Sequence, residues 1–321
     1  MLKGTSGVYW NKEKDEKMVN PMRGKFFCFS MVLDEKRRVV YTGGSTSRVI
    51  SFPEQTKIAE LKRVKNCSPY LSPQGTYVMF FNDSSYMYLY ETAQLEKCIF
   101  HGSFKMSGSN VVCWKDDECF LFATEGTINS IYIDKNNKKV EKTVLVDLRE
   151  YMENPDLQIT SVDCYNDKVL LFVRKWMPGI NNCIVEIDKD GDIRVRNLGD
   201  ELSSYDDVRY DRKGGVFYSN RSKNIAWCKK IDYINKADKT IENVKSYCTR
   251  VSSDGRYVVA GVRDGEKSSA IIFEANTFLV KRRFEYETAR WGLVGFSSDS
   301  HYVLVGGNNA QIIDVKDLSK E

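Results

Sequence analysis

This chain of 321 residues has few histidines, no long apolar run and no large excess of charge of one sign. It has two histidines, and it contains no glycine-rich phosphate loop, no His-Glu-x-x-His and no closely spaced cysteine pair. These absences remove the usual sequence signatures of nucleotide binding and of zinc-dependent hydrolysis. Its longest apolar runs, such as residues 169–173, are far shorter than the roughly 20 residues of a membrane-spanning helix. With 48 basic and 44 acidic residues the net charge is +4, which gives no reason to predict a nucleic-acid partner.

Nine cysteines are present, an odd number, and most of them lie inside apolar segments. A thiol in such a segment acts as a small hydrophobic side chain, and the scattered spacing is not typical of a disulfide framework. Residues 1–7 contain no apolar stretch of the kind that a secretory signal requires. We therefore expect a cytoplasmic protein that keeps its thiols reduced and does not enter a membrane.

What the chain does contain is one short pattern, a polar turn between two apolar runs, that returns every 40 to 50 residues. It is clearest at residues 251–259 (VSSDGRYVV) and 296–304 (FSSDSHYVL), and it recurs at residues 71–79 (LSPQGTYVM). Successive turns begin 38, 43, 50, 46, 42 and 45 residues apart. A period of this length indicates repeated supersecondary units, and seven of them account for nearly the whole chain.

The segment after each turn predicts the second strand of its unit. These segments are residues 39–42, 78–81, 120–123, 169–172, 216–219, 258–261 and 303–306. They are almost continuously apolar, which is typical of strands covered on both faces. Six predicted third strands then end in an apolar residue and an acid, at Glu91, Asp134, Asp188, Asp232, Glu274 and Asp314. In these features the chain resembles the WD-repeat β-propeller family, whose third strand commonly ends in tryptophan-aspartate, although no unit here carries a literal Trp-Asp.

We therefore predict an all-β fold, a seven-bladed β-propeller of four-stranded antiparallel blades, as a single domain over residues 1–321. The blades are expected at about residues 24–61, 66–100, 109–146, 158–198, 205–245, 246–284 and 291–318. The last blade has no room for a fourth strand, and residues 5–10 are predicted to supply it, which closes the ring and removes its open sheet edges. Residues 228–245 are the least regular stretch, so a count of six blades remains an alternative.

The residues just beyond the predicted second strands point to a charged arc on the upper face, which is the end of the ring where second strands lead into third strands. Three consecutive units place arginine there, and the two preceding units place carboxylates. The candidate binding residues are Arg174, Lys175, Trp176, Arg221, Arg263, Arg290 and Trp291. The guanidinium group of arginine binds carboxylates or phosphates through paired N–H donors, and tryptophan is enriched in the cores of interfaces. Ordinary solvated loops are the alternative explanation of the same pattern.

From this pattern we predict a non-catalytic interaction module, a monomeric scaffold whose upper face docks another protein or peptide, in particular an acidic or phosphorylated segment. No catalytic residue, metal ligand, cofactor, nucleic acid or membrane is expected. His101 is predicted in the connection after the second unit and His301 at the start of a second strand, so the two would lie at opposite ends of the ring. The alternative is a lactonase-like or hydrolase propeller that uses a metal and the channel carboxylates Asp163, Asp206 and Asp207.

Overall fold

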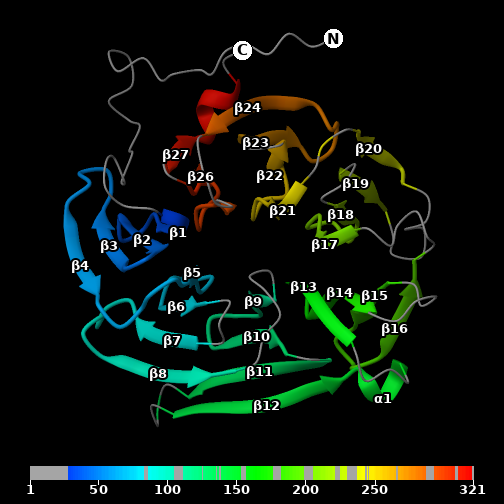
Figure 1. The fold of residues 1–321 in the computed structure, drawn as a ribbon, viewed down its shortest axis with the longest axis horizontal. Coiled ribbons are helices and arrows are strands. Elements are labelled where there is room, and N and C mark those ends of the chain that lie inside the picture. The colour runs from blue at the N-terminus through cyan, green and yellow to red at the C-terminus, as the bar shows by residue number, and fades with distance from the viewer. Residues whose placement is uncertain are drawn as a thin grey trace.

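The structure is a computed structural model in which seven antiparallel sheets stand around a common axis (Figure 1). It describes residues 28–82, 86–104, 111–124, 126–134, 136, 139–152, 157–175, 182–198, 205–220, 225–229, 237–242, 244, 246–264, 267–286, 293–307 and 310–319. Within each sheet the strand order follows the chain, so that the first strand is innermost and the last is outermost (Figure 1).

Each sheet is one blade, and the blades are numbered in chain order. Their first strands are β1 (Cys28–Asp34), β5 (Ser68–Leu71), β9 (Val112–Trp114), β13 (Leu157–Tyr165), β17 (Tyr205–Tyr210), β21 (Ser246–Val251) and β25 (Val294–Phe296). The second strands are β2 (Val39–Gly44), β6 (Tyr77–Phe81), β10 (Cys119–Ala123), β14 (Lys168–Lys175), β18 (Val216–Asn220), β22 (Tyr257–Asp264) and β26 (Tyr302–Val305). The third strands are β3 (Ser47–Ser51), β7 (Tyr86–Glu91), β11 (Thr127–Asp134), β15 (Cys183–Ile187), β19 (Ile225–Cys228), β23 (Lys267–Glu274) and β27 (Gln311–Asp314). The fourth strands are β4 (Lys57–Leu61), β8 (Cys98–Ser103), β12 (Lys139–Asp147), β16 (Ile193–Asn197), β20 (Lys239–Ile241) and β24 (Val280–Tyr286).

The fold class is the predicted one, a ring of seven antiparallel blades. Six blades have four described strands and blade 7 has three; the count of six blades is wrong, because β17 to β20 form a sheet of their own. Each predicted second strand overlaps an observed one. β14 and β22 continue about three residues further than predicted, because main-chain pairing extends through Lys175 and Asp264.

Helical structure among the described residues is confined to α1 (Arg149–Met152) and the 3₁₀ helix η2 (Val315–Ser319). α1 occupies the long connection between blades 3 and 4, near the outer rim (Figure 1). In the described ranges, no helix combines the length and the apolar character that crossing a bilayer requires. β19 ends at Cys228, and the predicted end of that third strand, at Asp232, lies outside the described residues.

The hydrophobic core lies between the blades rather than inside any one of them. β6 illustrates the arrangement, since all five of its residues are buried. Val78 and Phe80 pack in the layer shared with blade 1, whereas Met79 and Phe81 pack in the layer shared with blade 3. Because successive side chains of a strand point to opposite faces, an unbroken apolar run covers both neighbours. This is why the second strands read as continuous apolar segments.

Polar contacts join the blades at the lower face, the end where first strands turn into second strands. Hydrogen bonds or ion pairs join the turns at five of the seven junctions, and at the other two a glycine of one turn lies close to the turn of the preceding blade. The hydrogen bonds are Gln74 N–H to Asp117 Oδ1 (3.0 Å), Tyr165 O–H to the Arg212 carbonyl, Ser253 N–H to Ser300 Oγ (2.7 Å) and Asp299 N–H to Glu35 Oε1 (3.2 Å). An ion pair joins Lys115 Nζ to Asp167 Oδ1 (3.6 Å). Gly75 lies close to the Asp34 and Arg37 side chains, and Gly255 lies close to the Asp211 carbonyl. We call these turns the lower-face turns.

Blade 7 and blade 1 are in direct contact, so the ring is closed along its inner strands (Figure 1). The Gly307 N–H donates to the Cys28 carbonyl at 2.6 Å, and the Ser298 N–H donates to the Leu33 carbonyl at 3.2 Å. Between these two bonds lies an apolar layer that includes Leu33 and Ile312. The predicted closing strand, residues 5–10, lies outside the described residues.

Candidate functional site

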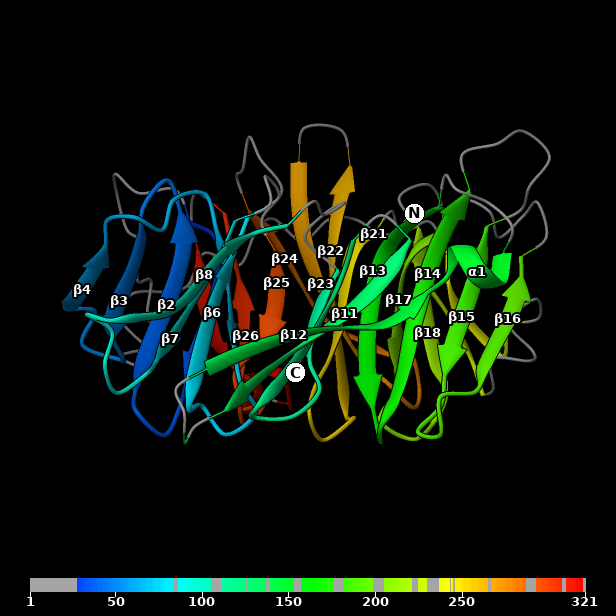
Figure 2. The ribbon, with the colours of Figure 1, turned by 90° about the horizontal axis from the view of Figure 1, so that it is seen from below.

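The charged residues predicted for the upper face lie at the ends of second strands, and β14 and β22 end at the same edge of the ring (Figure 2). Arg174 and Lys175 are the last two residues of β14, and Arg263 is the last but one of β22. These residues were predicted to begin loops. Main-chain pairing instead keeps them in the sheet, with Arg174 in register with Gln158 and Arg263 in register with Ser268.

The rest of the predicted arc falls on residues that the structure does not describe. Trp176, Arg221, Arg290 and Trp291 lie outside the described ranges. β18, the second strand of blade 5, ends at Asn220, so Arg221 follows its last residue directly. Of the predicted site, the described backbone thus brings Arg174, Lys175 and Arg263 to one face, on blades 4 and 6.

Carboxylates near the ring axis have a different role from the one that a hydrolase would give them. Asp163 Oδ2 accepts a hydrogen bond from the Tyr210 N–H of the next blade at 2.9 Å. Asp207 Oδ2 accepts one from the Thr249 N–H of the blade after that at 2.7 Å, and Asp207 Oδ1 accepts one from Ser161 Oγ at 2.8 Å. Both carboxylates therefore hold the first strand of the following blade. Asp206 lies on β17, and its side chain is not described.

A buried ion pair completes this contact between blades 4, 5 and 6. Arg209 Nη2 lies 2.9 Å from Asp207 Oδ1, and both side chains are almost fully enclosed. The same guanidinium donates to the Val162 carbonyl of blade 4 and to the Thr249 carbonyl of blade 6. Burial alone would lower the pKa of Arg209, but the Asp207 and Asp163 carboxylates outweigh it and raise that pKa. A guanidinium that is fully charged and bonded to both neighbours joins three blades.

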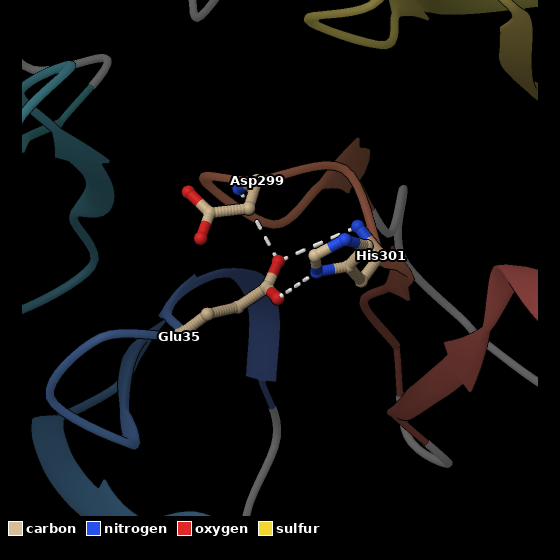
Figure 3. Close-up of side chains that lie close together, drawn as sticks. All are labelled: Glu35, Asp299 and His301. Atoms are coloured by element: carbon tan, nitrogen blue, oxygen red, sulfur yellow. Dashed lines mark hydrogen bonds and ion pairs between the residues drawn. The ribbon is translucent and has the colours of Figure 1, made fainter.

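A third group of polar side chains lies on the lower face, at the junction of blades 7 and 1. Glu35 comes from the lower-face turn of blade 1, and Asp299 and His301 come from that of blade 7 (Figure 3). Glu35 Oε2 and His301 Nδ1 share a hydrogen bond at 2.7 Å. Glu35 Oε1 accepts main-chain hydrogen bonds from Asp299 at 3.2 Å and from His301 at 3.4 Å (Figure 3).

Sequence reasoning missed this group. It predicted no metal ligand, and neither Glu35 nor Asp299 was singled out. His301 does lie directly before a second strand, β26, as predicted. The prediction for His101 was wrong, because this residue lies within β8 and stacks on the Tyr88 ring rather than in a connecting loop. A signal for the group was present in the alignment of the units, which puts Glu35 and Asp299 in the same kind of turn.

Seven antiparallel blades, with second strands covered on both faces, define a seven-bladed β-propeller, and the acid that ends the third strand in several blades is a point of resemblance to WD repeats. Solved structures share this fold. The β-propeller domain of Cps50 (Swd1) from Myceliophteria thermophila superposes with a TM-score of 0.68 at 14% identity, over 91% of this chain and 97% of that one. The structure of U3-55K gives 0.66 at 9% identity, over 92% and 97%.

Hydrazine synthase of Kuenenia stuttgartiensis has a similar ring, with a TM-score of 0.62 at 12% identity over 90% of this chain and 95% of that one. No family model matches the sequence, and no curated protein matches it either. At such identities the likeness concerns the fold alone. Because the fold recurs in a chain named as an enzyme, function has to be argued from the residues of this chain.

Proposed function

We propose that this chain is a non-catalytic interaction module, a scaffold whose upper face docks an acidic or phosphorylated segment of another protein. The observation that carries the proposal is the position of Arg174 and Arg263 at the upper ends of β14 and β22, on blades 4 and 6. Arg221 follows the last residue of β18 on the blade between them. In the sequence, three neighbouring blades thus carry an arginine at the end of the second strand or directly after it.

Such a row suits an extended anionic partner. A guanidinium binds a carboxylate or a phosphate through two parallel N–H donors, and each charge-assisted hydrogen bond contributes about 1.5 to 3 kcal/mol. Lys175, beside Arg174, adds a further positive charge.

The hydrolase alternative has less support from the described residues. A catalytic metal site needs carboxylates with open coordination positions. Asp163 and Asp207 are instead held by main-chain amides of the next blade, and Asp207 also neutralises Arg209. Their positions are accounted for by the contact between blades.

The test is a binding measurement on a double charge reversal, Arg174→Glu with Arg221→Glu. The full chain is immobilised and presented with arrays of acidic, phosphorylated and neutral peptides, alongside affinity capture from cytoplasmic extract read by mass spectrometry. We expect acidic or phosphorylated ligands to be retained by the original chain and to lose affinity about tenfold or more in the variant, since two favourable charges become repulsive.

A matched control reverses two arginines away from the upper face, Arg194→Glu with Arg283→Glu, on the outer strands β16 and β24. It changes the net charge by the same amount and should leave binding unchanged. Equal binding by all three proteins contradicts the proposal, and so does an equal loss in both variants, which would report net charge alone. Thermal unfolding of each variant shows that the fold is intact.

A further inference from the structure

The lower-face group at the junction of blades 7 and 1 has the composition of a metal site. Glu35, Asp299 and His301 each offer one ligand atom, and these three atoms lie within 4.8 Å of one another. Figure 3 shows the Glu35 carboxylate beside the imidazole ring, with Asp299 on the same turn as His301. The three side chains come from two elements that are far apart in the sequence and adjacent in the ring.

The Glu35 carboxylate is oriented by the turn that faces it. Its Oε1 atom accepts the Asp299 and His301 main-chain hydrogen bonds, which leaves Oε2 directed at His301 Nδ1. A carboxylate held in this way through one oxygen offers the other as a single ligand atom, which is the arrangement that outer hydrogen bonds give to metal ligands in general. The Glu35 side chain is only 12% exposed, whereas that of His301 is 59% exposed, so the group is anchored on one side and open to solvent on the other.

The distances fit a small divalent ion. Two ligands of a tetrahedral ion, each about 2.1 Å from it, lie about 3.4 Å apart. Glu35 Oε2 and His301 Nδ1 are 2.7 Å apart, so they need to separate by less than about 1 Å. Within the described residues, no hydrogen bond or ion pair engages the Asp299 carboxylate, and this side chain is exposed and can rotate. Solvent would supply the fourth ligand.

The donor set also indicates which kind of ion. One imidazole nitrogen and two carboxylate oxygens suit Zn²⁺ and its first-row neighbours, whereas Ca²⁺ and Mg²⁺ prefer oxygen ligands alone. Two carboxylates next to a neutral imidazole carry two negative charges, which a divalent ion balances. We propose that Glu35, Asp299 and His301 bind one divalent transition-metal ion, Zn²⁺ by preference, across the junction of blades 7 and 1.

The bound ion would join the first blade to the last. Its ligands come from the turn after β1 and the turn before β26, so the ion links two segments more than 260 residues apart in the chain. An ion that binds the folded ring and not the unfolded chain stabilises the ring by mass action. This role is independent of the upper face and of any partner bound there.

The experiment measures Zn²⁺ binding and its effect on unfolding, using the full chain freed of metal with a chelator and kept reduced. We expect one Zn²⁺ per chain from this site by equilibrium dialysis, and a rise of several degrees in Tm at ~100 times the Kd. Asp299→Asn and His301→Gln should each weaken binding about tenfold or more. Asp299→Asn is the safer of the two for the fold, because His301→Gln also removes the side-chain hydrogen bond to Glu35 Oε2.

His101→Gln is the matched control, since it removes the other histidine, on β8, and should leave binding unchanged. The nine thiols are competing ligands for zinc, so Co²⁺ is used as a spectroscopic probe. A spectrum without sulfur-to-metal charge transfer supports nitrogen and oxygen ligands. The proposal is overturned if Zn²⁺ leaves Tm unchanged, if Asp299→Asn and His301→Gln bind as the original chain does, or if Mg²⁺ stabilises the protein equally well.

Discussion

At the scale of single residues, Arg209 and Asp207 form the most enclosed ion pair of the described chain, with side chains only 6% and 1% exposed. A buried charge that loses its partner is costly, whereas the pair as a whole contributes little compared with apolar side chains of similar size. Removing one of the two residues therefore measures the cost of an unpaired buried charge, whereas replacing both measures the net contribution of the pair.

We expect Asp207→Ala to lower the free energy of unfolding by about 3 to 5 kcal/mol, because it removes the carboxylate that is paired with the buried Arg209 guanidinium. The double change Asp207→Ala with Arg209→Met should cost clearly less than Asp207→Ala alone. Urea unfolding measures both. Asp190→Ala, in the exposed turn before β16, is the control and should change stability by less than about 0.5 kcal/mol. If the double variant is as unstable as the single one, the ion pair is not what the carboxylate contributes.

Some residues could be interpreted from the sequence and others could not. A turn such as the one at Asp188 to Gly191 can be recognised in a sequence, because glycine at positive φ and an aspartate that accepts nearby amides are local features. The contact between Glu35 and His301 could not be predicted from the sequence. Each is an ordinary polar turn residue by itself, and only the closure of the ring brings them within hydrogen-bonding distance.

At the scale of elements, the second strands were predicted well because both of their faces are buried and their apolar runs are continuous. The ends of β14 and β22 were missed for the opposite reason. Arg174, Lys175, Arg263 and Asp264 are polar, and hydrophobic pattern says nothing about main-chain pairing that continues through polar residues. The backbone of Arg174, Lys175 and Arg263 is thus held by the sheet, which gives this part of the proposed docking surface a firmer base than loops would.

Close packing of one blade against the next also has a test at this scale. Gly43, in β2, lies against the main chain of Cys67 and the ring of Pro69, so a Cβ there would collide with the start of blade 2. We expect Gly43→Ala to lower the free energy of unfolding by about 1 to 3 kcal/mol. Gly295→Ala, in β25, is the matched control, because no atom lies within 4 Å of its added Cβ. Equal melting temperatures for the two variants would show that blades 1 and 2 are less tightly joined than the distances imply.

At the scale of the whole molecule, the repeat period fixed the number of blades, while closure of the ring is a matter of pairing between distant segments. Blade 7 has three described strands, β25 to β27. Residues 5–10 were predicted to form its fourth, and this pairing stays a prediction. The contribution of this predicted pairing to stability can be measured directly.

Deleting residues 1–10 should lower Tm by several degrees, because it would remove the predicted strand of residues 5–10 and its proposed pairing with β27. Deleting residues 1–4 alone is the control and should have no effect, since it keeps the predicted strand. Calorimetry on the two truncated chains and the full chain makes the comparison. Identical Tm values for all three chains would show that residues 5–10 do not form a strand of the ring.

The contact of Glu35 with the lower-face turn of blade 7 also has a consequence for how the chain is made. Glu35 and Asp299 are 264 residues apart, so this junction cannot form until almost the entire chain has left the ribosome. Until then, blade 1 presents an apolar flank, including Leu33 and Ile50, that blade 7 covers among the residues the structure describes. Domains assembled through such distant contacts fold slowly and expose apolar, aggregation-prone surface while they fold. Synthesis of this ring therefore includes a period in which the apolar flank of its first blade lacks its cover from blade 7, and that period ends when the last blade packs against the first.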